Sequence, residues 1–127
     1  MLTIINLVGT ALVFIAFGLW GLIDPIGMVV NLGLDISAPS GATAIRAIYG
    51  GFLIGLGLFI LYCAANDGRR RIGLAAILII VSTILSARII GAVVDGGELG
   101  IQVSYGAIEV FSIVVTASLL LIKRKPN

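Results

Sequence analysis

The stretch that decides the fold is LIGLGLFILYCAANDGRRRIGLAAILIIVSTI, residues 53–84. Two apolar runs flank a short hydrophilic turn, and the DGRRR segment at 67–71 holds every charge in the stretch. Both runs continue beyond the quoted residues, and a membrane-spanning helix needs roughly 20 predominantly apolar residues. The stretch therefore predicts two helices that cross a membrane in opposite directions and are joined by a tight turn.

The composition extends this prediction to the whole chain. Of its 127 residues, 60% are hydrophobic and 11% are charged, and the mean hydropathy is +1.23; a soluble domain carries about 25% charged residues. Four stretches are long and apolar enough to span a bilayer, at about residues 2–23, 42–65, 72–94 and 100–122. We predict an all-α, integral membrane four-helix antiparallel bundle, a single transmembrane domain over residues 1–127. The first run lacks the basic segment and cleavage site of a signal peptide, so we expect it to be retained.

Basic and acidic residues lie in different loops, which predicts how the chain is oriented in the membrane. Basic residues follow the second and fourth spans: Arg69, Arg70 and Arg71, then Lys123, Arg124 and Lys125. The other two loops carry only acidic charges: Asp24, Asp35, Asp95 and Glu98. Short loops rich in Lys and Arg stay cytoplasmic, so we expect both termini and the 66–71 loop in the cytoplasm. The basic clusters are short and flank spans, which argues against nucleic-acid binding.

The first outer loop has the signals of a short helix. Asp24 can cap a helix whose first position is Pro25, and Gly33 can end it. We expect this helix to lie in the membrane interface or to pack back against the bundle. Ser40 is then the expected cap of the second span.

Cysteine and histidine usage limits the chemistry. There is no histidine, and Cys63 is the single cysteine, which excludes the usual zinc constellations, a CxxC redox pair and an internal disulfide. Cys63 is expected to be a small buried apolar residue. No nucleophile–base pair or nucleotide motif is present, so we expect no catalytic residues, metal or cofactor and favour a non-enzymatic protein.

Glycines are placed for close helix packing. Gly51 and Gly55 form a GxxxG motif in the second span, and Gly18 and Gly21 lie in the first. Small residues let helix backbones approach each other in lipid. Packing within the monomer is the favoured interpretation, and a homo-oligomer or partner interface through Gly51 and Gly55 is the alternative.

Three ionisable residues lie inside the spans: Arg46, Arg88 and Glu109. At 1.5 Å rise per residue, all three are expected in the outer half of the bilayer. The fourth span carries a polar stripe with spacing 3, 4, 3 and 4, namely Gln102, Tyr105, Glu109, Ser112 and Thr116. Such a stripe should face the bundle interior or a water-filled cavity.

These residues permit a structural and a functional interpretation. An unpaired charge at the centre of a span costs about 2.5–3.5 kcal/mol, and arginine cannot lose its proton. In the structural interpretation Glu109, Asp95 and Asp24 neutralise Arg46 and Arg88 and only fix how the helices pack. Gln102, Ser112 and Thr116 would support that network.

In the functional interpretation the arginines leave a cationic pocket open to the outer side. Tyr49 and Tyr105 would line it beside Arg46, Arg88 and Glu109, and the 24–41 loop would cover it. Guanidinium groups bind carboxylates and phosphates bidentately, so an anionic small molecule or lipid headgroup is the expected ligand. Proton transfer through Glu109 is a further alternative.

The chain resembles a known family through four segments in order. They are GLIDP at 21–25, IRAIYGGFLIGLGLF at 45–59, ARIIGAVVDG at 87–96 and AIEV at 107–110. They are similar to small four-helix inner-membrane proteins of bacteria that are catalogued as a domain of unknown function. A more distant likeness, to DoxX-like proteins, rests on size and topology.

The resemblance implies a four-helix bundle in the cytoplasmic membrane of a bacterium, and it implies no activity. The positions to which it points are Asp24, Arg46, Tyr49, Arg88 and Glu109. The sequence thus favours a membrane protein that binds an anionic ligand. An accessory subunit of a larger membrane complex, and a small transporter or membrane enzyme, are the alternatives.

Overall fold

The computed structural model describes residues 1–96 and 100–122. Glu98 and the cluster Lys123, Arg124 and Lys125, which entered the orientation argument, lie outside the described residues.

Within those residues the chain is helical. The elements are α1 (Leu2–Ile23), α2 (Pro25–Val30), α3 (Pro39–Ile45), the π-helical segment η1 (Arg46–Phe52), α4 (Leu53–Ala64), α5 (Arg70–Asp95) and α6 (Gly100–Leu121). The segments α3, η1 and α4 run on as one helix, so four helices are long and apolar enough to cross a membrane. The predicted all-α, four-span architecture is confirmed. The second and third spans begin a few residues earlier than predicted.

The helix α2 forms as the sequence predicts. The Asp24 carboxylate accepts a hydrogen bond of 2.9 Å from the Gly27 backbone N–H, and Pro25 occupies the first helical position. Gly33 follows in the left-handed conformation (φ +78°), which lets the Leu34 N–H reach the Val29 carbonyl at 3.1 Å. Met28 and Val29 are buried, so α2 packs back against the bundle.

The predicted cap of the second span is wrong. The helix begins at Pro39 with Ala38 as its N-cap, and Ser40 lies inside the first turn. Ala38 has an extended backbone, which is the conformation preferred before proline. Proline fits the first helical position because it has no N–H to leave unpaired.

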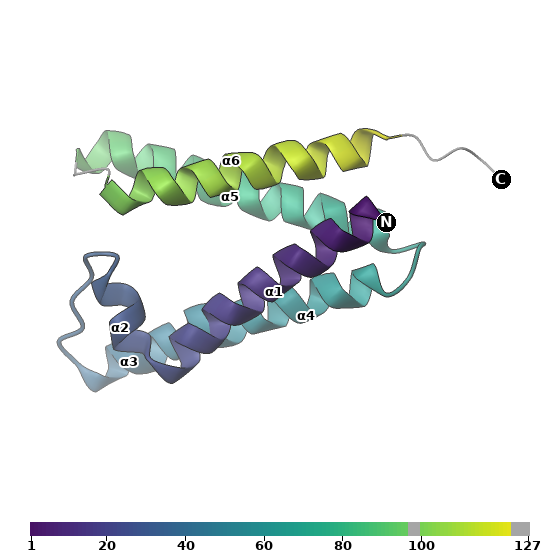
Figure 1. Cartoon of the computed structure of the whole chain (residues 1–127). Helices are drawn as coiled ribbons and strands as arrows, with labels where there is room; N and C mark the ends of the chain where they lie inside the picture. The colour runs from purple at the N-terminus through teal and green to yellow at the C-terminus, as the bar shows by residue number, and fades with distance from the viewer. Residues whose placement is uncertain (97–99, 123–127) are drawn as a thin grey trace.

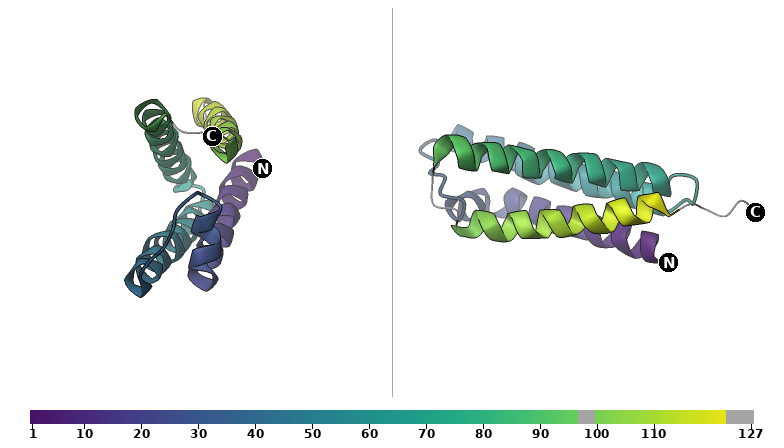
Figure 2. Two further views of the ribbon diagram at one scale, coloured as in Figure 1. Left: turned by 90° about the vertical axis from the view of Figure 1, so that its left-hand side faces the viewer. Right: turned by 90° about the horizontal axis from the view of Figure 1, so that it is seen from above.

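The four spans form two hairpin-like pairs, one of α1 with η1 and α4 and one of α5 with α6. Figure 1 shows the two pairs meeting at the end that carries the 66–71 loop and the N-terminus. They splay apart toward α2 and α3, and the end-on view in Figure 2 shows the same separation. We call these the loop end and the α2 end of the bundle.

The hydrophobic core lies toward the loop end. Its buried members come from α1, α4 and α5, and they are Leu7, Ala11, Ile60, Ala64, Leu74, Ile77 and Val81. Cys63, buried and unpaired as expected, lies at the same end. A hydrogen bond of 3.2 Å from the Asn6 amide to the Thr116 hydroxyl adds α6 to this region. The bundle is thus held together mainly at one end.

The glycines divide into two groups. A Cβ at Gly18 would lie 2.9 Å from the Ile54 backbone nitrogen, and one at Gly57 would lie 2.8 Å from the Ala11 carbonyl oxygen. These glycines let α1 and α4 approach closely. Gly51 and Gly55 face outward, and nothing lies within 4 Å of a Cβ built at Gly55. The favoured interpretation, that this GxxxG pair packs within the monomer, is therefore wrong.

The outer surface is apolar along the spans. Side chains such as Phe52, Phe111 and Ile79 are more than 60% exposed. Soluble proteins rarely expose an apolar surface that extends this far. Together with the four spanning helices, this surface makes the chain a multi-pass membrane protein.

Candidate functional site

The polar stripe of α6 faces the interior of the bundle. Thr116 is fully buried, and Gln102, Tyr105, Glu109 and Ser112 are partly buried. Several apolar residues between them are exposed, namely Val103, Ile108, Val110 and Phe111. The predicted facing of the stripe agrees with this burial, because residues spaced three and four apart share one side of a helix.

Glu109 finds its partner on α5. The Arg88 Nε donates to Glu109 Oε2 at 3.1 Å, and Nη2 donates to Oε1 at 2.6 Å. The Arg88 side chain is 24% exposed and that of Glu109 is 13% exposed. This two-bond fork is the strongest ordinary geometry for a guanidinium and a carboxylate. It explains how a carboxylate is accommodated in the middle of an apolar helix.

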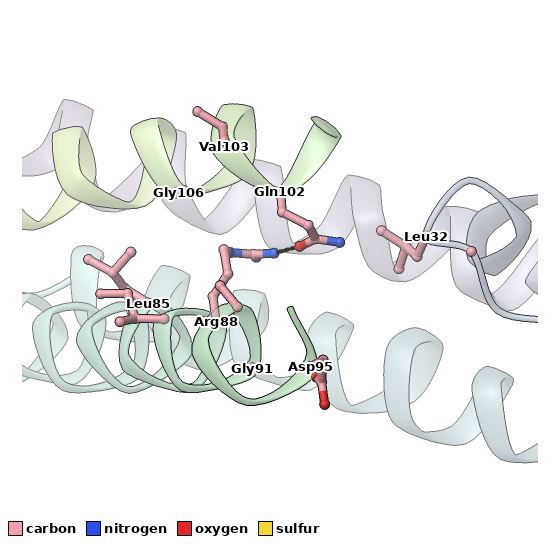
Figure 3. A pocket seen from close by; sticks show the side chains of 11 residues that line it. Leu32, Leu85, Arg88, Gly91, Asp95, Gln102, Val103 and Gly106 are labelled. Atoms are coloured by element: carbon pink, nitrogen blue, oxygen red, sulfur yellow. Dashed lines mark hydrogen bonds between the residues drawn. The ribbon is translucent and has the colours of Figure 1, made fainter. Parts of the chain in front are cut away.

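Two further side chains of α6 hold the arginine in place. Nη1 of Arg88 donates a hydrogen bond to the Gln102 amide oxygen, and the two side chains point toward one another in Figure 3. The Tyr105 ring centroid lies 5.5 Å from the Arg88 Cζ, within the range of a cation–π contact. Arg88 therefore bridges α5 to three residues on one face of α6.

A cavity of about 780 Å³ lies beside this pair, toward the α2 end. Its walls come from α5, from α6 and from the segment that follows α2, as Figure 3 shows. The polar part of the wall is Arg88, Gln102 and Asp95, and the apolar part includes Leu32, Leu85, Ile89 and Val103. Gly91 and Gly106 complete the wall without side chains. The cavity is therefore amphipathic, with one polar corner.

The guanidinium of Arg88 keeps hydrogen-bonding capacity at this corner. Arginine has five N–H donors. Three of them are engaged by Glu109 and Gln102. The remaining two belong to the terminal nitrogens of this side chain, which lines the cavity. The charge of Arg88 is matched by Glu109, so directional hydrogen bonds, and not excess charge, distinguish this corner.

Arg46 lies elsewhere. Its Nε donates a hydrogen bond of 3.1 Å to the Leu22 carbonyl at the end of α1, and its side chain is exposed. Tyr49, one turn later, lies against Gly21 of α1. Neither residue lines the cavity. The structure thus brings Arg88, Glu109, Tyr105 and Gln102 together and leaves Arg46 and Tyr49 apart.

The two aspartates expected to neutralise arginines do not do so. Asp24 caps α2, and Asp95 lies at the end of α5 on the cavity wall. Within residues 1–96 and 100–122, the ion pairs of the arginines are Arg88–Glu109 and Arg70–Asp67. A pocket in which Arg46 and Arg88 together outnumber Glu109, as the functional interpretation had it, is not formed.

Two features were missed by the sequence analysis. Asn6 was given no role, yet it ties α1 to the last stripe residue, Thr116. The apolar wall was also missed, although Leu85 and Ile89 lie three residues before and one after Arg88 on the same helix. Helical spacing from Arg88 and Gln102 would have found part of it.

Metal ligation finds no support in the part of the chain that the structure describes, because no three His, Cys, Asp or Glu residues cluster there.

Comparison with known proteins identifies a family for this chain. Neither the curated proteins nor the solved structures contain a match to this chain. The model of one family matches residues 2–120, which include all four spans and the Arg88–Glu109 pair. The resemblance to an uncharacterised family is thereby confirmed, and the likeness to DoxX-like proteins stays a prediction. The chain belongs to the family described as "Domain of unknown function (DUF4345)".

Proposed function

We propose that this chain is a non-enzymatic membrane protein that binds an anionic small molecule or lipid headgroup at the polar corner of the large cavity. The observation that carries the proposal is the position of Arg88 and Gln102, which are hydrogen-bonded to each other, on the wall of a cavity of about 780 Å³. Glu109 holds Arg88 there from behind the wall. An ion pair that only fixes helix packing needs no cavity beside it. The ligand would accept hydrogen bonds from the two remaining N–H groups of Arg88.

The cavity's lining supports an amphipathic ligand in particular. Leu85, Ile89 and Val103 provide an apolar surface next to the polar corner. A carboxylate or phosphate would lie at Arg88, where guanidinium donors suit planar or branched oxyanions. An acyl or other apolar group would lie along the wall and displace water from it.

The experiment is native mass spectrometry of the protein released from its own membrane. We expect a defined adduct on the wild type and its loss from Arg88→Gln. The matched control is Arg46→Gln, which removes the same charge from an arginine outside the cavity and should keep the adduct. Absence of any adduct from the wild type would overturn the proposal.

A second variant guards against a misfolded Arg88→Gln protein. A Cβ at Gly106 would lie 3.8 Å from the Arg88 Cδ, so Gly106→Leu fills the cavity without a backbone clash at Cβ. Its control is Gly9→Leu, where nothing lies within 4 Å of the added Cβ. Retention of the adduct by Gly106→Leu and Arg88→Gln alike would place the ligand elsewhere.

The proposal includes an orientation and a location. The four spans would form one transmembrane domain in the cytoplasmic membrane of a bacterium, with both termini and the 66–71 loop in the cytoplasm. The basic run Arg69–Arg71 supports this by the positive-inside rule. The cavity then opens in the outer half of the membrane.

Cysteine labelling tests the orientation. In a Cys63→Ala background, a cysteine at Ser37 should react with a membrane-impermeant maleimide in intact cells. One at Gly68 should react only after the cells are opened. Labelling of the Gly68 position in intact cells would reverse the orientation.

An accessory subunit of a larger membrane complex is the second candidate function, and the outward face of Gly51 and Gly55 favours it. Small residues on a lipid-facing helix let a partner helix approach. Gly55→Leu should then release a partner, or a second copy, that co-purifies in mild detergent, and Gly9→Leu should not. Recovery of the wild-type chain alone would argue against this candidate.

A further inference from the structure

A second, smaller cavity lies at the loop end, opposite the proposed ligand site. Its volume is about 260 Å³. Three helix ends form it: the start of α1, the start of α5 and the end of α6. These are the points where spans leave the apolar part of a bilayer, so the cavity lies at the level of lipid headgroups.

Two consecutive arginines border this cavity. Arg70 is held from two sides, because its Nε donates to the Ala64 carbonyl at 3.0 Å and its Nη1 pairs with Asp67. Its side chain is 26% exposed. Arg71 also lines the cavity, is exposed, and makes no hydrogen bond or ion pair with any residue described. Among the described residues that line the cavity, Asp67 is the carboxylate and Arg70 and Arg71 are the guanidinium groups.

Beside the polar residues Thr3, Asp67 and the two arginines, the wall is apolar. Its apolar side chains include Ile4 of α1, Leu74 of α5 and Leu119 of α6, with Ile122 directly after α6. A soluble anion would use only the arginines. A phospholipid would use both parts, with its phosphate at the arginines and an acyl chain along the apolar wall.

The third arginine of the run points elsewhere. The Arg69 guanidinium lies 3.8 Å from the centroid of the Tyr62 ring on α4, and Arg69 does not line the cavity. The three arginines are therefore not equivalent members of a basic loop. Two of them are placed at a concave, half-apolar site, and one is stacked on an aromatic ring.

We infer that Arg70 and Arg71 bind the phosphate of an anionic phospholipid whose acyl chain occupies the groove between α1, α5 and α6. Arginine at a membrane surface attracts anionic lipids, and basic pockets between spanning helices recognise their headgroups. Arg70 is pre-positioned by Ala64 and Asp67, which lowers the ordering required on binding. The inference does not depend on the proposed function, because the two cavities lie at opposite ends of the bundle.

The test is titration of the purified protein with phosphatidylglycerol, monitored by native mass spectrometry, with phosphatidylcholine of the same chain lengths as reference. We expect preference for phosphatidylglycerol. Arg71→Gln should lower this preference for phosphatidylglycerol over phosphatidylcholine about fivefold. The double variant Arg70→Gln/Arg71→Gln should lower it roughly thirtyfold. Arg69→Gln, which removes the same charge from the same turn, should change it less than about twofold. Thermal melting of each variant verifies folding.

Three results would overturn the inference. Equal losses in Arg69→Gln and Arg71→Gln would mean that only net charge matters. Displacement of the lipid by millimolar inorganic phosphate would mean that the site takes a soluble oxyanion and not a lipid. Loss of phosphatidylglycerol in Gly106→Leu would place that lipid in the large cavity, which would support the proposed function and not this site.

Discussion

At the scale of single residues, the Arg88–Glu109 pair places two opposite charges inside the spans. Both groups lie within apolar helices and are mostly shielded from solvent. They differ in what happens when the partner is lost. A glutamate can take up a proton and become neutral, whereas an arginine keeps its charge. The two halves of the pair are therefore energetically unequal.

This inequality predicts an asymmetric double-mutant cycle. Glu109→Gln strands the Arg88 charge and should lower the free energy of unfolding by about 2–3 kcal/mol. Arg88→Gln should lower it by about 1 kcal/mol, the value of lost hydrogen bonds, because Glu109 can be neutralised. The double variant has no unpaired charge, so its free energy of unfolding should lie close to that of Arg88→Gln and above that of Glu109→Gln. Reversible unfolding in bicelles measures all three values. Equal costs for the two single variants would contradict the argument.

At the scale of elements, the sequence predicts each helix well and the relation between helices poorly. The spacing of Gln102, Tyr105 and Glu109 identifies the inward face of α6, because helical periodicity is a local property. The partner of Glu109 is not local. Two arginines were available at similar depth, and only the rotation of α5 and α4 about their axes selects Arg88.

The π-helical segment η1 explains part of this failure. On a regular helix of 3.6 residues per turn, Arg46, Tyr49 and Leu53 would lie on one face. A π-helical turn has a wider i to i+5 hydrogen-bond pattern, and it spans Arg46–Phe52. The face is displaced across that turn, so Arg46 is exposed while Tyr49 is half-buried. No residue pattern in the segment signals the change.

Close contact between α1 and α4 gives a prediction for these elements. Gly57→Ala places a Cβ 2.8 Å from the Ala11 carbonyl oxygen and 2.5 Å from the Ile15 side chain. It should lower the free energy of unfolding by about 1–3 kcal/mol, the usual cost of overpacking. Gly55→Ala, two residues earlier on the same helix, meets nothing within 4 Å and should be neutral or stabilising, since alanine favours helix over glycine. Equal destabilisation by both variants would show that α1 and α4 do not approach as described.

At the scale of the whole molecule, the bundle is asymmetric along its length. The buried core cluster joins α1, α4 and α5 near the loop end, and the large cavity lies between α5, α6 and the segment after α2 at the other end. Hydropathy could not reveal this, because the spans are similarly apolar throughout. The burial of each apolar residue depends on which neighbour it meets. Core contacts resist local opening, and regions with few of them open at lower free energy.

The asymmetry predicts where the molecule moves. Spin labels at Ile23 and Val94, both exposed at the α2 end, should give a broad distance distribution in a Cys63→Ala background. Labels at Leu2 and Leu121, exposed at the loop end, should give a narrow one, because the core holds the two helix pairs together there. Gly106→Leu, which fills the cavity, should narrow the distribution at the α2 end and leave the loop end unchanged. Equally narrow distributions at both ends would mean that the cavity is a rigid feature of the bundle, and ligand entry would then need no separation of the two pairs.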